Sequence, residues 1–261
     1  MTTVIVPVDF SVTSFNAANY AAKFLEGHEE VTLILYHSYA KEAELSSVTE
    51  ELELLKNTLS KGQKVKIETL SHHEPNFIAG FEKAARHRSA NLVIMGIKGK
   101  STLTHVVFGS NTLKMVDTKA CPVLIVPEHA NFTKMENVML TSDFKDTVNS
   151  TPSGPIKDFL SVYKPQLHVV NVDKDHYISL TEKYEKEKQE LRKLLDEYNP
   201  EFYFMRLYDI DEALNLFAED RDIDLIIAVK KNHTFMEKLF KSSRTKKMTY
   251  HNKLPILVIH E

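Results

Sequence analysis

The segment from Met95 to Asn111 carries the residue types and spacing best suited to binding an anionic ligand. Met95-Gly96-Ile97-Lys98-Gly99 ends an apolar run, and Gly109-Ser110-Asn111 follows after nine residues. A helix that begins there would present free backbone N–H groups and the positive end of its dipole, which favour phosphate. Ser110 would add a hydroxyl donor, and Lys98 and Lys100 would add charge. The pattern predicts a phosphate-binding loop. A surface loop whose glycines only cap a helix and form turns would show the same pattern.

Two other phosphate-binding motifs do not fit this segment. Gly99-Lys100-Ser101 ends like a P-loop, but Ile94 stands where that motif needs its first glycine. Residues 96–99 lack the G-x-G of a dinucleotide fingerprint, and they follow the fourth expected strand instead of the first. Neither motif explains the glycines.

Apolar runs of strand length alternate with stretches of helical period along the whole chain. The runs are rich in Val, Ile and Leu without polar alternation, which is typical of parallel strands buried on both faces. We expect right-handed βαβ crossovers and a doubly wound α/β sheet. The expected strands are residues 3–8, 31–37, 64–70, 91–96 and 122–127, and then 136–142, 166–172, 201–207, 224–229 and 255–260.

Three intervening segments predict helices of different character. After a Ser11 cap, an apolar stripe runs through Phe15, Ala18, Ala22 and Leu25. A second stripe consists of Leu45, Val48, Leu52, Leu55 and Leu59. The helix expected at residues 179–197 is heavily charged, which favours a solvated face with Glu–Lys pairs over an interaction motif.

The chain contains an internal repeat of about 133 residues. The matching segments are 91–96 with 224–229, 122–126 with 255–259 and, at an offset of 134, 6–10 with 140–144. Because repeats of this size are whole folding units, we expect two related domains, residues 1–130 and residues 131–261.

Gly96-x2-Gly99-x9-Gly109-Ser110, together with Met95 and the opening segment Pro7-Val8-Asp9-Phe10-Ser11, resembles the ATP-binding class of the universal stress protein (UspA) family. The resemblance extends over essentially the whole chain, whose two units look like the two domains of a tandem family member. It implies two Rossmann-like α/β domains of the adenine nucleotide alpha-hydrolase-like type, each a five-stranded parallel sheet in the order 3-2-1-4-5. In that order strands 1 and 4 are neighbours at a topological switch point, where ligands bind.

The family's site can be carried over residue by residue. Pro7, Val8 and Asp9 match the adenine side, and Ser38 matches a position that contacts adenine through its backbone. The ribose and phosphate side is matched by Met95, Gly96, Gly99, Gly109, Ser110 and Asn111. Asp9 has a structural interpretation as well, since it could simply help to cap the first helix.

The second half departs from this motif. Its residues at the positions of Gly96, Gly99, Gly109 and Ser110 are Val229, Asn232, Ser242 and Ser243. We therefore expect a degenerate domain that binds no nucleotide and serves as an intramolecular pseudo-dimer partner; family members usually pair through their fifth strands, and a homodimer is possible too. Between residues 230 and 247 seven basic residues accompany one acidic residue. A solvated face is favoured there over a docking site for a polyanion.

Composition excludes several classes of protein. Lys+Arg 33 against Asp+Glu 36 gives a net charge of -3, which argues against non-specific nucleic-acid binding. No apolar run approaches the roughly 20 residues that span a bilayer. One cysteine and an opening segment without signal-peptide features predict a cytoplasmic protein without disulfides.

Catalytic and metal-binding patterns are weak. The adjacent pair His72-His73 is poorly spaced to share one ion, so we expect no metal site. Cys121 is expected to be a small buried hydrophobe and not a nucleophile. No Ser-His-Asp or paired-carboxylate spacing is present. Any ATP hydrolysis should therefore be slow.

The expected function is a universal stress protein that binds ATP, ADP or AMP, with Mg2+ accompanying ATP, and acts in nucleotide-dependent stress signalling or as a scaffold. One alternative is a structural interaction module that binds no nucleotide. The other is an enzyme of the alpha-hydrolase-like superfamily that activates a substrate with ATP. Against the enzyme, Val8-Asp9-Phe10-Ser11 replaces the Ser-Gly-Gly-x-Asp-Ser type of loop expected after strand 1.

Overall fold

A computed structural model describes residues 1–61, 64–97, 110–173, 182–206, 210–230 and 254–261. The described residues divide into two compact units, a first unit that ends at Thr133 and a second unit that begins at Lys134. Phe132 belongs to the first unit, because it packs edge-on against Tyr20 and Phe24. Among the described residues, no helix combines the length and apolarity needed to cross a membrane.

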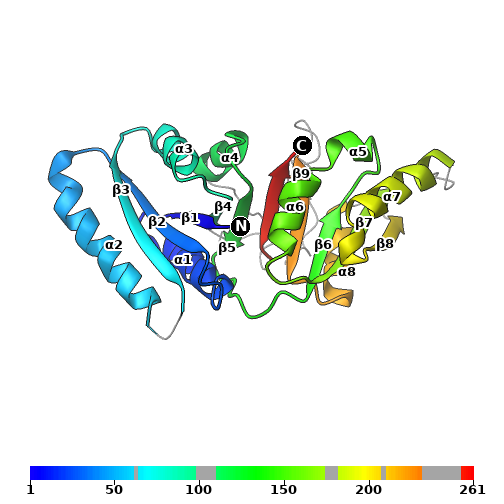
Figure 1. The fold of residues 1–261 in the computed structure, drawn as a ribbon, viewed down its shortest axis with the longest axis horizontal. Helices are drawn as coiled ribbons and strands as arrows, with labels where there is room; N and C mark the ends of the chain where they lie inside the picture. Colours follow the sequence, from blue (N-terminus) through cyan, green and yellow to red (C-terminus); the bar gives the residue numbers. More distant parts are fainter. Residues whose placement is uncertain (62–63, 98–109, 174–181, 207–209, 231–253) are drawn as a thin grey trace. The chain divides into compact units, whose positions relative to one another are not determined.

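The first unit is a parallel sheet with helices between its strands (Figure 1). Its strand order is β3-β2-β1-β4-β5, as predicted. Helix α1 contacts α2, and α3 contacts α4, which fits two pairs of helices on opposite faces of a doubly wound sheet. The elements are β1 Thr3–Pro7, α1 Val12–Phe24, β2 Thr32–Tyr39, η1 Glu42–Glu44, α2 Leu45–Leu59, β3 Lys66–His73, α3 Phe77–His87, β4 Leu92–Ile97, α4 Ser110–Asp117 and β5 Val123–Pro127.

The second unit repeats this topology. Its strand order, β8-β7-β6-β9-β10, is again 3-2-1-4-5, and the pairs within it are parallel. The elements are β6 Asn137–Thr141, α5 Thr147–Ser150, α6 Ser153–Leu160, β7 Gln166–Asp173, α7 Glu182–Leu194, η2 Asp196–Tyr198, β8 Glu201–Arg206, α8 Ile210–Asp220, β9 Leu225–Lys230 and β10 Ile256–His260. The predicted fold class is therefore confirmed in both units.

The central strands form the core of each unit. Val4, Ile5 and Val6 of β1 have no exposed surface, and neither has Ile94 of β4. Burial on both faces explains why these strands lack polar alternation.

The predicted stripe of α1 is wrong at Phe15, which is 39% exposed. The buried face is formed mainly by small residues, Ala17, Ala18, Ala21 and Ala22. Alanines let α1 lie close to β4, and a Phe ring does not fit in that space. Leu45 in the second stripe is also exposed, because it is the first residue of α2.

Helix α7 ends at Leu194, before the expected residue 197, and its charged face is solvated as predicted. Residues 179–181 of the expected helix lie outside the described residues. Lys188 pairs with Glu185 at 3.6 Å, and Lys193 pairs with Glu190 at 2.9 Å. Its buried contacts come from Tyr184 and Leu191.

Candidate functional site

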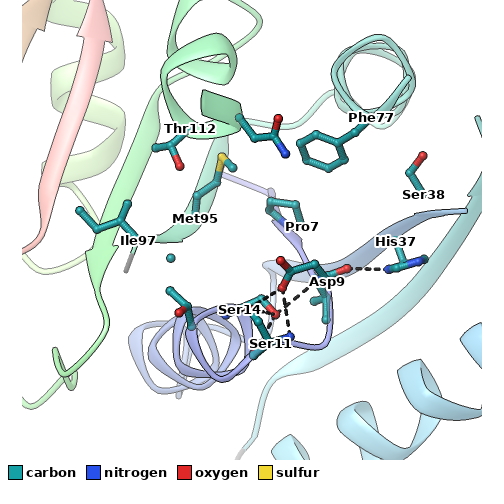
Figure 2. A pocket seen from close by; sticks show the side chains of 14 residues that line it. Pro7, Asp9, Ser11, Ser14, His37, Ser38, Phe77, Met95, Ile97 and Thr112 are labelled. Carbon is teal, nitrogen blue, oxygen red and sulfur yellow. Dashed lines mark hydrogen bonds between the residues drawn. The ribbon is translucent and has the colours of Figure 1, made fainter. Parts of the chain in front are cut away.

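A pocket of about 320 Å³ opens at the carboxyl ends of β1, β2 and β4 in the first unit (Figure 2). Strands β1 and β4 are neighbours, with Val4 paired to Leu92 and Ile5 to Val93. The strand order reverses between them, so the pocket occupies the topological switch point of the sheet. Its lining residues are Pro7, Val8, Asp9, Ser11, Thr13, Ser14, His37, Ser38, Phe77, Met95, Gly96, Ile97, Asn111 and Thr112.

The fold brings most of the predicted site residues together in this pocket. Seven of them line it: Pro7, Val8, Asp9, Ser38, Met95, Gly96 and Asn111. Ser110 is the first described residue of α4. Gly99 and Gly109 lie outside the described residues, as do Lys98 and Lys100.

Asp9 follows β1 and faces the pocket while it also organises the start of α1. Its Oδ1 accepts hydrogen bonds from the backbone N–H of Ser11 at 3.1 Å and from the Ser11 hydroxyl at 2.5 Å. Ser11 Oγ in turn accepts from the N–H of Ser14 at 3.2 Å, which caps the helix. Burial alone would raise the pKa of Asp9, but the hydrogen bonds from Ser11 and Ser14 lower it below its ordinary value. Asp9 is therefore a stable carboxylate at neutral pH.

His37 and Ser38, at the end of β2, are held by backbone carbonyls. His37 Nδ1 lies 2.7 Å from the carbonyl oxygen of Val8, and because a carbonyl only accepts, Nδ1 carries the proton. Phe10 stacks on the His37 ring with centroids 4.7 Å apart. The Ser38 hydroxyl donates to Glu74 O at 2.5 Å. The Ser38 hydroxyl is therefore engaged within the protein.

The phosphate side predicted for the pocket has very little space around Gly96. A Cβ at Gly96 would lie 2.3 Å from the carbonyl oxygen of Thr13 and 2.8 Å from Thr13 Cγ2. Only glycine lets the first turn of α1 lie this close to the end of β4. Thr13 is itself buried, and its hydroxyl has no hydrogen-bond partner among the described residues.

Sequence reasoning did not select several lining residues. Thr13, Ser14, His37, Phe77, Ile97 and Thr112 were not predicted as site residues, and Ser11 was expected only as a helix cap. A hydroxyl-rich turn after the first strand, Ser11-Val12-Thr13-Ser14, was the available signal. His37 and Phe77 carried no such signal, because only the sheet register and the start of α3 bring them to the pocket.

The second unit keeps part of the same local geometry. Phe144 repeats the left-handed backbone of Phe10, with φ of 48° against 59°. Asn171 replaces His37 and donates to Ser142 O at 2.8 Å. Val229 stands at the place of Gly96, and the residues aligned with Gly99, Gly109 and Ser110 lie outside the described ones, as do residues 231–247 of the basic segment.

Two other sequence candidates are placed away from the pocket. Burial raises the pKa of the Cys121 thiol to about 12, so it is a poor nucleophile, although Cys121 is half-buried and not fully buried as expected. His73 stacks on Tyr39 at the end of β3. The described residues contain no group of three or more His, Cys, Asp or Glu that could hold a metal ion.

Residues 1–127 match the universal stress protein family. None of the curated proteins matches the chain. Among solved structures, a universal stress protein from Archaeoglobus fulgidus DSM 4304 is similar with a TM-score of 0.68 and 15% identity, over 99% of this chain and 98% of that chain. A functionally unknown protein from Pseudomonas aeruginosa PAO1 is similar with a TM-score of 0.64 and 14% sequence identity. That match covers 100% of this chain and 92% of that chain.

A universal stress protein solved in complex with cAMP gives a TM-score of 0.39 and 20% identity, over 48% of this chain and 95% of its own. That similarity is too low to carry its ligand over to this chain. The two similarities that cover the whole chain show that its fold is the one found in these structures. Residues 1–127 therefore match the universal stress protein family in sequence, and the chain as a whole shares the fold of these structures.

Proposed function

We propose that the first unit binds an adenine nucleotide in the switch-point pocket and that the protein acts in stress signalling or as a scaffold in a nucleotide-dependent way. The observation that carries the proposal is the convergence of Pro7, Val8, Asp9, Ser38, Met95, Gly96 and Asn111 on one pocket from four separate segments. At about 320 Å³, the pocket lies within the range of ligand pockets in proteins.

The two ends of the pocket suit the two ends of a nucleotide. Pro7, Val8, Ser38 and Phe77 offer apolar surface and backbone groups to a base (Figure 2). Asn111, near the described start of α4, offers a backbone N–H group to ribose and phosphate, and Gly96 lines the same pocket without adding a side chain. ATP, ADP and AMP share these requirements, and Mg2+ would arrive with ATP, held mainly by the phosphates.

We expect the nucleotide to be held instead of rapidly hydrolysed. Asp9 is the carboxylate that lines the pocket, and it already accepts two hydrogen bonds from Ser11. Those bonds and a lowered pKa make it a weak general base.

Titration calorimetry with ATP, ADP, AMP and GTP tests the proposal, together with mass analysis of any nucleotide released from the purified protein. Asp9→Ala should weaken ATP binding about tenfold or more, since a charged hydrogen-bonding group is lost. Asp143→Ala is the matched control, because Asp143 has the same place in the second unit and accepts from Lys145 N at 3.1 Å. It should leave affinity within about twofold. Absence of binding to every adenine nucleotide would instead favour the interaction module.

A further inference from the structure

Phe77 places an aromatic ring in the wall of the pocket. It is the first residue of α3, it lines the pocket and it is half-buried. Figure 2 shows its ring extending from α3 toward Pro7, which lines the same pocket from the end of β1. Of the lining residues that the structure describes, Phe77 and His37 carry flat rings, and the His37 ring already stacks on Phe10. Phe77 is therefore the better candidate for an aromatic contact with a ligand.

The ring of Phe77 is supported by two buried aromatic rings. Phe81, one turn further along α3, has its ring centroid 5.8 Å from that of Phe77. Tyr36 of β2 packs edge-on against Phe81, with centroids 5.2 Å apart. Phe81 and Tyr36 have no exposed surface. Because these rings already fill the adjoining core, the Phe77 ring has no space to turn inward and stays in the wall of the pocket.

The start of α3 is tied to the end of β2, where Ser38 lines the pocket. The Ser38 hydroxyl donates to Glu74 O at 2.5 Å, and the Glu74 N–H donates to Tyr39 O at 3.0 Å. The Glu74 carboxylate accepts from the N–H of Asn76 at 3.1 Å, and Asn76 caps the helix. These bonds hold Phe77 beside the strand end that the family resemblance assigns to adenine.

A half-buried aromatic ring beside a strand end suits a flat heterocycle. Stacking of a base on an aromatic side chain changes affinity by about fivefold to 150-fold. A purine has two fused rings, so it covers more of a phenyl face than the single ring of a pyrimidine and gains more from the contact. In the second unit the first residue of the corresponding helix α8 is Ile210, which has no flat ring.

We propose that Phe77 is a further ligand-binding residue, whose ring stacks on the base of the bound nucleotide and gives the pocket a preference for purines over pyrimidines. This inference rests on the proposed function of the same pocket. It assigns recognition of the flat base to a residue of α3. Because the contact involves the base alone, its contribution should be the same for adenosine, AMP and ATP.

Phe77→Leu tests the stacking, because leucine keeps an apolar side chain next to Phe81 and removes the flat ring. In titration calorimetry with the full chain, the variant should bind ATP at least about fivefold more weakly. UTP should lose less, so the ratio of the ATP affinity to the UTP affinity should fall. Phe77→Tyr, which keeps the ring, should bind ATP within about twofold. Phe204→Leu is the matched control, since Phe204 is 37% exposed and lies in the second unit, and it should change neither affinity.

Fluorescence gives a readout that a purely structural role of Phe77 would not change. The chain contains no tryptophan, so Phe77→Trp introduces a single indole ring at the pocket. Saturating ATP should quench its emission, because a stacked base would lie on the ring. Phe204→Trp is the matched control, and ATP should leave its emission unchanged. Unquenched emission of Phe77→Trp at saturating ATP would contradict the stacking.

Unchanged ATP affinity in Phe77→Leu, with the natural protein binding ATP, would overturn this inference and leave the proposed function intact. Equal losses of ATP and UTP affinity would assign Phe77 a structural role and would also overturn the inference. If the natural protein binds no adenine nucleotide, the proposed function fails, and the inference fails with it.

Discussion

At the scale of single residues, Asp9 shows that the two interpretations open at the sequence level do not exclude one another. The carboxylate accepts hydrogen bonds from Ser11 at the start of α1, and the same side chain lines the pocket. The helix cap holds Asp9 in its ionised form and fixes its direction. Asp9, expected either to help cap the first helix or to face a ligand, holds the cap residue Ser11 and also lines the pocket.

Ser11→Ala should raise the pKa of Asp9 towards its ordinary value of 3.8, because the variant removes the hydroxyl that donates to Oδ1. A pH titration of the Asp9 carboxyl carbon by NMR in both proteins measures the change. The loss of the cap should also cost about 1 kcal/mol of unfolding free energy at neutral pH. An unchanged Asp9 pKa would contradict the role given to Ser11.

The sign of the pH dependence follows from the lowered pKa. Because Asp9 is more acidic in the folded protein, its stabilising effect is present above pH 4 and is lost as the pH falls through the folded pKa. The stability difference between the natural protein and Ser11→Ala should therefore be constant at neutral pH and shrink at acid pH. Asp9 is exposed, so salt should weaken the effect.

At the scale of elements, the alternation of apolar runs was enough to predict each strand that the structure describes in the two units. Strand identity depends on local composition, and buried parallel strands are strongly apolar. The pocket was predictable where residues stand at or just after strand ends, as Gly96 and Asp9 do. Thr13, His37 and Phe77 were missed because their places depend on how helices and strands pack, which spacing along the chain does not encode.

The corresponding helices of the two units differ at one packing contact. Helix α1 is continuous over 13 residues and lies against Gly96. In the second unit Val229 takes that place, and the helix is interrupted between α5 and α6, before Pro152. Proline lacks the N–H that a helix interior needs, which accounts for the break.

Gly96→Ala should therefore destabilise the protein, by about 1–3 kcal/mol, because its Cβ would meet the backbone of Thr13 at 2.3 Å. Urea unfolding measures the change. Gly154→Ala in α6 is the control: nothing lies within 4 Å of its added Cβ, and alanine is the better helix former. It should leave stability unchanged or raise it. Equal effects of the two variants would show that the contact of α1 with β4 is not tight.

At the scale of the whole molecule, one fold is used twice with different local chemistry. Both units keep the 3-2-1-4-5 sheet and the left-handed aromatic residue after the first strand, Phe10 and Phe144. They differ at positions that line the pocket in the first unit, where Val229 replaces Gly96 and Asn171 replaces His37. The expected pairing of the two units through their last strands stays a prediction. The repeat thus separates the residues that both units share from those found only at the pocket of the first unit.

This asymmetry predicts one nucleotide per chain. Val229 places a branched side chain where Gly96 lets α1 lie against β4 in the first unit, so the second unit cannot form the switch-point pocket in the same way. Calorimetry with ATP should give a stoichiometry of one, and native mass spectrometry should show a single adduct. The Asp143→Ala variant should keep that stoichiometry, since the second unit would contribute no site. Two equivalent sites in the natural protein, reduced to one by Asp143→Ala, would show that the second unit also binds nucleotide and that loss of the glycines does not abolish the site.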